Sequence, residues 1–386
     1  MIRKQVTEIE PFAGRAAAAP VTDDGPLARE VAAANAAAVA HSRTRLSARL
    51  PGDALAAADR YFERPSVAGW PPQARPALAA DELFRLVCAT PRSATVRDKA
   101  DGLQIELRSL DETFELEDLG HRVEPDSDVL MLSSMRLAAA AARNTSIELR
   151  QFDRQCPSWA PFADDLAAVT GADVYLKLFI ADGNRSVNGW HRDSSDVLVT
   201  MLHGEKRFAT ADAEAGEPDT DPEPEVDALL RPGDALRLPR SMLHCATPSG
   251  GLSALLSMGL MRVADWPYRQ IPPIHLGFRD YPRSAAAYRL CLRPHTPAAT
   301  AKGEGRPLRS RAPGGIALLD TRGEQARVVT AGTVYEASTA EVRVLATVHG
   351  GNGLAEAEVA ARTGLPVAQC AGAMEALVRQ GLLHYS

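Results

Sequence analysis

Apolar and polar positions change their period along this chain, from a helical spacing to short β-rich runs and back again. Residues 14–60 are rich in alanine and have apolar positions at helical spacing, which predicts one or two helices flanking the core. The runs MLSSMRLAAAAARN and APFADDLAAVTG predict two more helices, and Gly171 suits the C-terminal end of the second. The first half of the chain is therefore expected to contribute mostly helices.

Short β-rich segments dominate residues 172–264. VYLKLFIAD, VLVTMLHG, KRFATA, DALRLPR and LLSMGLMRV are separated by Gly, Pro and Asp. Several short strands with turn residues between them predict an antiparallel barrel or jelly roll. Residues 212–227 form an insert crowded with acids and prolines, which we expect to be a solvated loop.

Helical spacing returns after Trp266. YPRSAAAYRLCLR predicts a helix, and the Pro-, Gly- and Arg-rich stretch 297–315 predicts a linker. The last part of the chain has three amphipathic helical runs with glycine stops and a terminal strand, which suggests a winged helix. Residues 335–386 contain five acids against three arginines, whereas a DNA-reading winged helix needs the opposite sign. We therefore expect protein contact or packing there, and no direct DNA binding.

Composition narrows the class of protein further. The 386 residues are enough for two or three domains. A formal net charge of −6 and a pI near 5.9 argue against nucleic acid or an anionic membrane as the main partner. No segment approaches the length of a membrane span, and the start of the chain lacks an apolar signal core. The five scattered cysteines form no CxxC pair, so we expect a reducing compartment, the cytoplasm.

The strongest chemical signal is NGWHRD at residues 188–193. His191 and Asp193 are two residues apart at the entry to a predicted strand, and side chains with that spacing share one face. His244 follows a PGD turn and a short apolar strand, so a neighbouring strand can supply it as a third ligand. Two histidines and one carboxylate form the facial triad of non-haem Fe(II) sites, with three coordination positions left open. The alternatives are a zinc site, which would need a further ligand, and ordinary polar loop histidines.

Lys206 adds a second element to this site. It follows His191 by fifteen residues, beyond one predicted strand and one turn. A cation one strand away from a metal can pair with the distal carboxylate of a bound 2-oxoglutarate. The alternative is a solvated turn lysine. Lys206 and Arg207 are adjacent and face opposite sides of the strand, so we expect one of them to point inward.

These blocks resemble the JmjC/cupin oxygenases, most closely their ribosomal-oxygenase branch. WHRDSSDVLVTMLHGEKRF is similar to that branch's H-x-D strand followed by L-x-G-x-K/R-x-W/F, and RPGDALRLPRSMLHCATP to its PGD-x-L-Y-x-P-R-x-x-x-H segment. The resemblance implies that His191, Asp193 and His244 are the catalytic Fe(II) ligands. It also implies that Lys206 binds the C5 carboxylate of 2-oxoglutarate and that Ser257 lines the same pocket.

The resemblance implies an architecture as well: an α+β fold with a double-stranded β-helix (jelly-roll or cupin) core and flanking helices. An Ala-rich helical extension (residues 1–60) precedes the catalytic domain (61–264) in this scheme. A helical segment (265–300) that forms a homodimer follows, and then a linker with a winged helix (301–386).

The implied activity is Fe(II)- and 2-oxoglutarate-dependent hydroxylation of a side chain in a protein or peptide, either a ribosomal protein or a peptide natural-product precursor. Demethylation by the same chemistry stays open, and so does a non-catalytic cupin and winged-helix protein that binds or regulates. The sequence departs from the family at Phe208, Arg237 and the residues before His191. Asn188 and Trp190 are expected to contact substrate at the mouth of the site, with rim packing as the alternative for Trp190.

Overall fold

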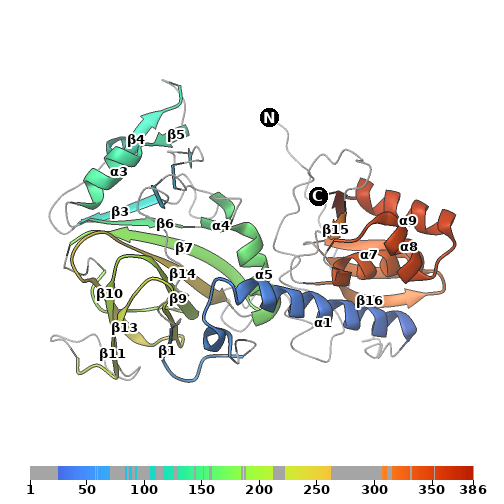
Figure 1. Ribbon diagram of the computed structural model, residues 1–386, viewed down its shortest axis with the longest axis horizontal. Helices are drawn as coiled ribbons and strands as arrows, with labels where there is room; N and C mark the ends of the chain where they lie inside the picture. Colours follow the sequence, from blue (N-terminus) through green and yellow to red (C-terminus); the bar gives the residue numbers. More distant parts are fainter. Residues whose placement is uncertain are drawn as a thin grey trace, which may run out of the picture.

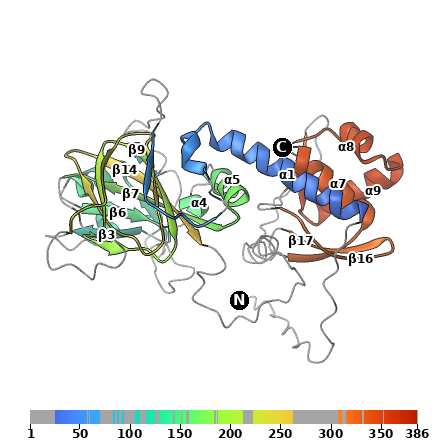
Figure 2. The same cartoon turned by 90° about the horizontal axis from the view of Figure 1, so that it is seen from below.

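A long helix joins two modules in this protein. The computed structural model describes most of residues 25–69, 116–261 and 307–385, with short pieces between 83 and 109. We call residues 47–261 the sheet module and residues 307–385 the C-terminal module. Helix α1 (Pro26–Leu46) runs between them, as the blue ribbon in Figures 1 and 2 shows.

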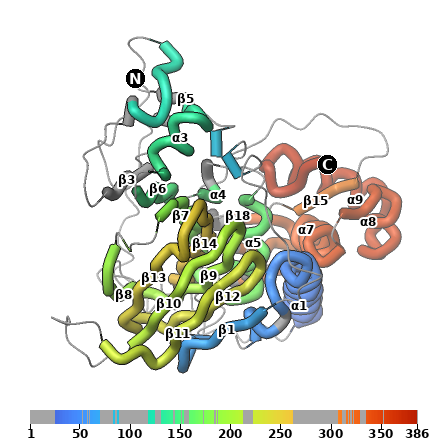
Figure 3. The backbone as a smooth tube through the Cα atoms, turned by 60° about the vertical axis from the view of Figure 1, so that its left-hand side comes forward, coloured from blue at the N-terminus to red at the C-terminus, as the bar shows by residue number. Residues whose placement is uncertain are grey.

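The sheet module is built on a seven-stranded major sheet with the order β1-β12-β9-β14-β7-β6-β3, in which neighbouring strands pair antiparallel. Four of the long runs predicted from the sequence are present as β7, β9, β12 and β14, which lie side by side in Figure 3. The strands of the sheet are β1 (Ser66–Ala68), β3 (Ile105–Ser109), β6 (Thr145–Leu149), β7 (Asp173–Ala181), β9 (Asp196–His203), β12 (Ala235–Leu238) and β14 (Ser253–Met261).

A smaller sheet with the order β11-β10-β13-β8 is antiparallel throughout. It contains the predicted strand KRFATA, and side chains from its strands and from the major sheet line one common cavity. Two antiparallel sheets with a shared interior agree with the cupin-type core expected from the sequence. Its strands are β8 (His191–Arg192), β10 (Lys206–Ala211), β11 (Val226–Leu230) and β13 (Leu243–Pro248).

Successive side chains of β7 point alternately to the two faces of the major sheet, one facing the hydrophobic core and the other the cavity. Leu176 and Leu178 point to the outer face and are fully buried with Leu166 of α5 (Ala160–Thr170). Gly171 ends α5 with φ of 66° and donates its N–H to Ala167, which confirms the predicted cap. The remaining short elements of the module are η1 (Gly52–Leu55), β2 (Arg92–Ser93), η3 (Leu116–Leu119), β4 (Gly120–Arg122), β5 (Val129–Leu132), α3 (Ser134–Ala141) and α4 (Phe152–Gln155).

Helix α1 is bonded to both modules. Near its end, Arg45 makes two hydrogen bonds to the carboxylate of Asp165, Nε to Oδ2 at 2.9 Å and Nη2 to Oδ1 at 2.6 Å. The Ser42 hydroxyl donates to the same carboxylate at 2.8 Å. Nearer its start, the Asn35 amide makes one bond to the carbonyl and one to the N–H of Ile316, at 2.8 and 3.0 Å. The alanine-rich helix therefore ties the C-terminal module to the sheet module.

The C-terminal module contains the three predicted helices and the terminal strand. A three-stranded antiparallel sheet, β16-β17-β18, precedes them and was not predicted from the sequence. The elements are β15 (Leu308–Ser310), β16 (Ala317–Arg322), β17 (Gln325–Thr330), β18 (Thr333–Ser338), α7 (Thr339–Gly351), α8 (Glu356–Thr363), α9 (Val367–Arg379) and β19 (Leu383–Tyr385). The winged helix stays a prediction.

Several predicted segments fall wholly or partly outside the described residues. They are the first 24 residues of the Ala-rich extension (1–60), residues 212–221 of the acidic insert, the predicted dimerisation segment (265–300) and much of the linker (297–315). The insert is shorter than predicted, because β11 begins at Val226 and Asp227 on it binds Arg207 of β10. Within the described part of the chain, no helix combines the length and apolar character needed to cross a bilayer.

Candidate metal site

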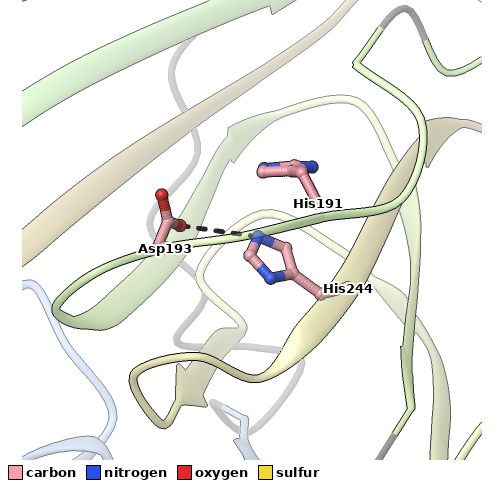
Figure 4. A group of neighbouring side chains, drawn as sticks. All are labelled: His191, Asp193 and His244. Atoms are coloured by element: carbon pink, nitrogen blue, oxygen red, sulfur yellow. Dashed lines mark ion pairs between the residues drawn. The ribbon is translucent and has the colours of Figure 1, made fainter. Parts of the chain in front are cut away.

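His191, Asp193 and His244 converge on one point, as Figure 4 shows. The pairing of β8 with β13 sets His191 opposite His244, and Asp193 follows β8 directly. The two imidazole rings are 4.3 Å apart between centroids, and His244 Nε2 lies 3.5 Å from Asp193 Oδ2. One ligand atom from each residue lies within 4.8 Å of the other two. This set of donors can hold one metal ion, as the spacing of the residues predicted.

Backbone carbonyls fix which nitrogen of each histidine faces the site. His191 Nδ1 lies 3.1 Å from the carbonyl of Gly189, and His244 Nδ1 lies 3.0 Å from that of Met242. A carbonyl only accepts, so both Nδ1 atoms carry the proton and both Nε2 lone pairs are left for a metal. Burial, and then the neighbouring His191, lower the pKa of His244, which favours the neutral form that metals bind.

A hydrogen-bonded turn holds His244 against the HxD segment. Ser241 donates its N–H to the Asp193 carbonyl at 2.8 Å, and Arg192 Nη1 donates to the Ser241 carbonyl at 2.7 Å. The buried carboxylate of Asp196 accepts from the N–H of Arg240 at 3.0 Å. Ser241 adopts a φ of 61°, a left-handed conformation uncommon outside glycine. Sequence reasoning missed this positioning role of Asp196, although a second Asp three residues after Asp193 was visible.

A cavity of about 270 Å³ between the two sheets opens from the triad. The apolar lining includes Val197, Val199, Phe208, Leu238 and Leu255, which belong to one buried cluster. We call the part of the cavity that these side chains line, along β10 from the triad toward Lys206, the apolar shaft.

Lys206 lies at the far end of this shaft. The residue is 4% exposed, whereas its neighbour Arg207 points outward and binds Asp227. Among the described residues, Lys206 has no acidic partner. Burial lowers the pKa of Lys206 to about 8. Of these two adjacent cations, Lys206 therefore points inward and Arg207 outward. This agrees with the expectation from the sequence that one of the two points inward.

The other predicted residues divide between cavity and surroundings. Ser257 and Asn188 line the cavity with the triad and Lys206. Trp190 is half-buried and is not among the lining residues.

Sequence reasoning also missed polar residues on β6 and β7. Glu148, Tyr175 and Lys177 line the cavity beside the triad. Only the inward phase of β7 could have indicated Tyr175 and Lys177, because strand residues two apart share a face.

Residues 149–266 match the family model described as the JmjC domain. No curated protein matches the chain. Among solved structures, the chain is similar to YcfD, a ribosomal oxygenase from Escherichia coli. Its complex with cobalt and succinic acid is 14% identical (TM-score 0.49), and its complex with cobalt and 2-oxoglutarate 15% (TM-score 0.49). Both alignments cover 85% of this chain and 96% of the other.

Proposed function

We propose that this chain, whose residues 149–266 match the JmjC domain, is an Fe(II)- and 2-oxoglutarate-dependent oxygenase that acts on a protein or peptide. The observation that carries the proposal is a buried cation and a facial triad in one cavity. The triad offers a metal three ligands from one side, and Lys206 offers an anion a charge at the other end.

The donor set fits Fe(II). Two neutral Nε2 atoms and one carboxylate oxygen occupy one side of the ion and leave the cavity side open for exchangeable ligands. Asp193 Oδ2 and His244 Nε2 are already within coordination reach of a shared centre. When bound, Fe(II) and 2-oxoglutarate would supply the reduction of dioxygen, of which one oxygen atom would enter the substrate C–H bond and the other the succinate that forms from 2-oxoglutarate together with carbon dioxide.

The distance along β10 suits a bridging dicarboxylate. His244 is paired with Thr210, and Lys206 lies four residues from Thr210 on the same strand, about 13 Å at the usual rise. The long side chain of Lys206 reaches into the cavity and shortens that distance. Phe208 lines the wall between the two ends, where methylene groups would lie and water would be excluded.

Metal and co-substrate binding can be tested apart from turnover. Full-length protein loaded with Mn(II) is expected to bind 2-oxoglutarate in calorimetry, and with Fe(II) to form succinate. His191→Ala should lose the metal, whereas Lys206→Met should keep the metal and lose 2-oxoglutarate. Arg207→Met, which removes the outward cation next to Lys206, is the matched control. The proposal is wrong if 2-oxoglutarate binds wild type and Lys206→Met equally, or if Fe(II)-loaded wild type forms no succinate in the presence of 2-oxoglutarate and dioxygen.

The protein or peptide substrate and the homodimer belong to the same proposal and rest on the family resemblance. Mass spectrometry of candidate peptides distinguishes a gained oxygen from a lost methyl group. Light scattering of the full chain measures the expected dimer, whose segment 265–300 lies outside the described residues.

A further inference from the structure

Tyr175 lies in the wall of the cavity that the major sheet forms. Strand β7 contributes Tyr175, Lys177, Phe179 and Ala181 to this wall, because residues two apart on a strand share a face. Lys206 comes from β10 of the minor sheet, so the proposed seat of 2-oxoglutarate runs along the opposite wall. A substrate side chain that approaches the metal beside 2-oxoglutarate is therefore left with the major-sheet wall.

The Tyr175 side chain extends across β14 at Gly259. Gly259 is paired with Tyr175 of β7 on one side and with Val197 of β9 on the other. A Cβ at Gly259 would overlap Cζ, Cε1 and the hydroxyl of Tyr175. At the preceding positions of the same phase on β14, Leu255 and Ser257 have side chains that line the cavity themselves. At Gly259 the tyrosine ring takes the place of the missing side chain.

A hydrogen bond holds the far end of this side chain beside the HxD segment. The Tyr175 hydroxyl lies 3.2 Å from Ser195 Oγ. Ser195 is 1% exposed and follows Asp193 by two residues, and both Asp193 and Tyr175 line the cavity. The ring is thus fixed at two points, at Gly259 by close contact and at Ser195 by its hydroxyl.

The fixed ring decides how much of the cavity a substrate can use next to the triad. One cavity of about 270 Å³ must hold the metal ion, 2-oxoglutarate and the target side chain. Beyond the ring, the wall continues through Val197 and Leu238, which are paired across β9 and β12. The phenol and these two aliphatic side chains present apolar surface with a single hydroxyl. This wall suits the carbon chain of a slim side chain that lies against it.

We propose that Tyr175 is a specificity-determining residue, whose ring admits an aliphatic side chain to the metal and excludes an aromatic one. This inference rests on the proposed function and restricts the substrate class of that site. Two opposite changes follow from the geometry. Removing the ring should open the site to aromatic side chains, and pushing the ring away from β14 into the cavity should hinder aliphatic ones.

Small blocked amino acids test the inference. The full chain is loaded with Mn(II) and 2-oxoglutarate, and calorimetry confirms that both bind before any probe is added. The probes are the N-acetyl N-methylamides of norvaline, which has an unbranched alkyl side chain, and of phenylalanine. The relaxation of their protons by Mn(II) is measured by NMR as the probe is titrated, and a Zn(II)-loaded sample gives the diamagnetic baseline.

Wild type should relax the norvaline probe alone, and Tyr175→Ala should relax both probes, a gain that misfolding cannot produce. Tyr175→Phe keeps the ring and should behave as wild type. In Gly259→Ala the new Cβ pushes the ring into the cavity, so the norvaline probe should bind about tenfold more weakly, as for a misfit of one methylene group. Phe179→Ala is the matched control, because it removes a ring from the same face of β7 about 13 Å along the strand. It should leave the phenylalanine probe unrelaxed.

The inference is overturned if wild type does not relax the norvaline probe, or if wild type and Tyr175→Ala relax the same probes. It is also overturned if Tyr175→Phe or Phe179→Ala admits the phenylalanine probe, or if Gly259→Ala binds the norvaline probe as tightly as wild type. Loss of Mn(II) or 2-oxoglutarate binding from Tyr175→Ala would overturn it too, because Tyr175 would then serve the metal or the co-substrate. Failure of wild type to bind metal and 2-oxoglutarate would instead refute the proposed function.

Discussion

Replacing Lys206 by methionine should stabilise the ligand-free protein while abolishing co-substrate binding. Lys206 is a charged side chain in an apolar shaft with no acidic partner among the described residues. Methionine has a similar length and no charge, so it fills the same space without the desolvation cost.

The pKa of Lys206 gives the size of the effect. Burial lowers that pKa to about 8 from the ordinary 10.5. Each pKa unit corresponds to about 1.4 kcal/mol, so a protonated Lys206 lowers the free energy of unfolding by about 3 kcal/mol at pH 7. Lys206→Met should recover most of this, a rise in Tm of roughly 6–12 °C if the sheet module unfolds as a typical domain of its size.

The pH dependence has a definite sign. Below pH 8 Lys206 is protonated in the folded and the unfolded chain, so the cost is present in full. Between pH 8 and 10.5 the folded lysine is neutral while the unfolded one still binds a proton, so the cost falls as the pH rises. The stability gap between Lys206→Met and wild type should therefore close over that range.

Urea denaturation of both proteins at pH 7 and at pH 10, with and without 2-oxoglutarate on the Mn(II)-loaded chain, measures these effects. 2-Oxoglutarate should raise the stability of wild type alone. A less stable Lys206→Met protein, a gap that widens above pH 8, or equal stabilisation of both proteins by 2-oxoglutarate would refute the reasoning.

Three further substitutions test the frame around the site. Ser241→Gly should raise the free energy of unfolding by about 0.5–1 kcal/mol in urea denaturation, because glycine adopts φ of 61° without strain. An unchanged free energy of unfolding would mean that the backbone at Ser241 is not strained. Gly259→Ala should cost about 1–3 kcal/mol by displacing Tyr175, with Mn(II) affinity unchanged in calorimetry; lost Mn(II) binding would contradict this. Arg45→Met leaves the buried Asp165 with one hydrogen bond fewer on each oxygen, so it should cost about 1–3 kcal/mol in thermal unfolding and expose α1 to limited proteolysis; unchanged digestion would contradict that.

The convergence of His191, Asp193 and His244 was predictable because the relevant signals are local. HxD places two ligands on one face by spacing alone, and the PGD turn before β12 places the return strand that leads to His244. The long strands β7, β9 and β14 were visible for the same reason, since their β-rich runs are bounded by turn residues.

Pairing between distant strands was not predictable in this way. β8 and β13 are short and irregular in sequence, yet their register brings His191 to His244. The ion pair between Glu148 and Lys177 depends on the pairing of β6 with β7, and the sequence near either residue contains no signal that predicts the other as its partner. The sequence also did not predict that the alanine-rich helix α1 joins the two modules. Its hydrogen bonds are to the Asp165 carboxylate and to the backbone of Ile316, which are both far from α1 in the sequence.

The two lysines of the cavity illustrate why burial and partners together decide function. Lys177 shares a carboxylate and its side chain is 28% exposed, so the ligand-free protein holds its charge with some compensation. Lys206 has neither advantage, and only an anion that enters the shaft can supply the missing charge. A protein that keeps an uncompensated ammonium at the end of an apolar shaft gives up stability when empty and regains it on binding. That exchange is the physical argument for placing the co-substrate at Lys206.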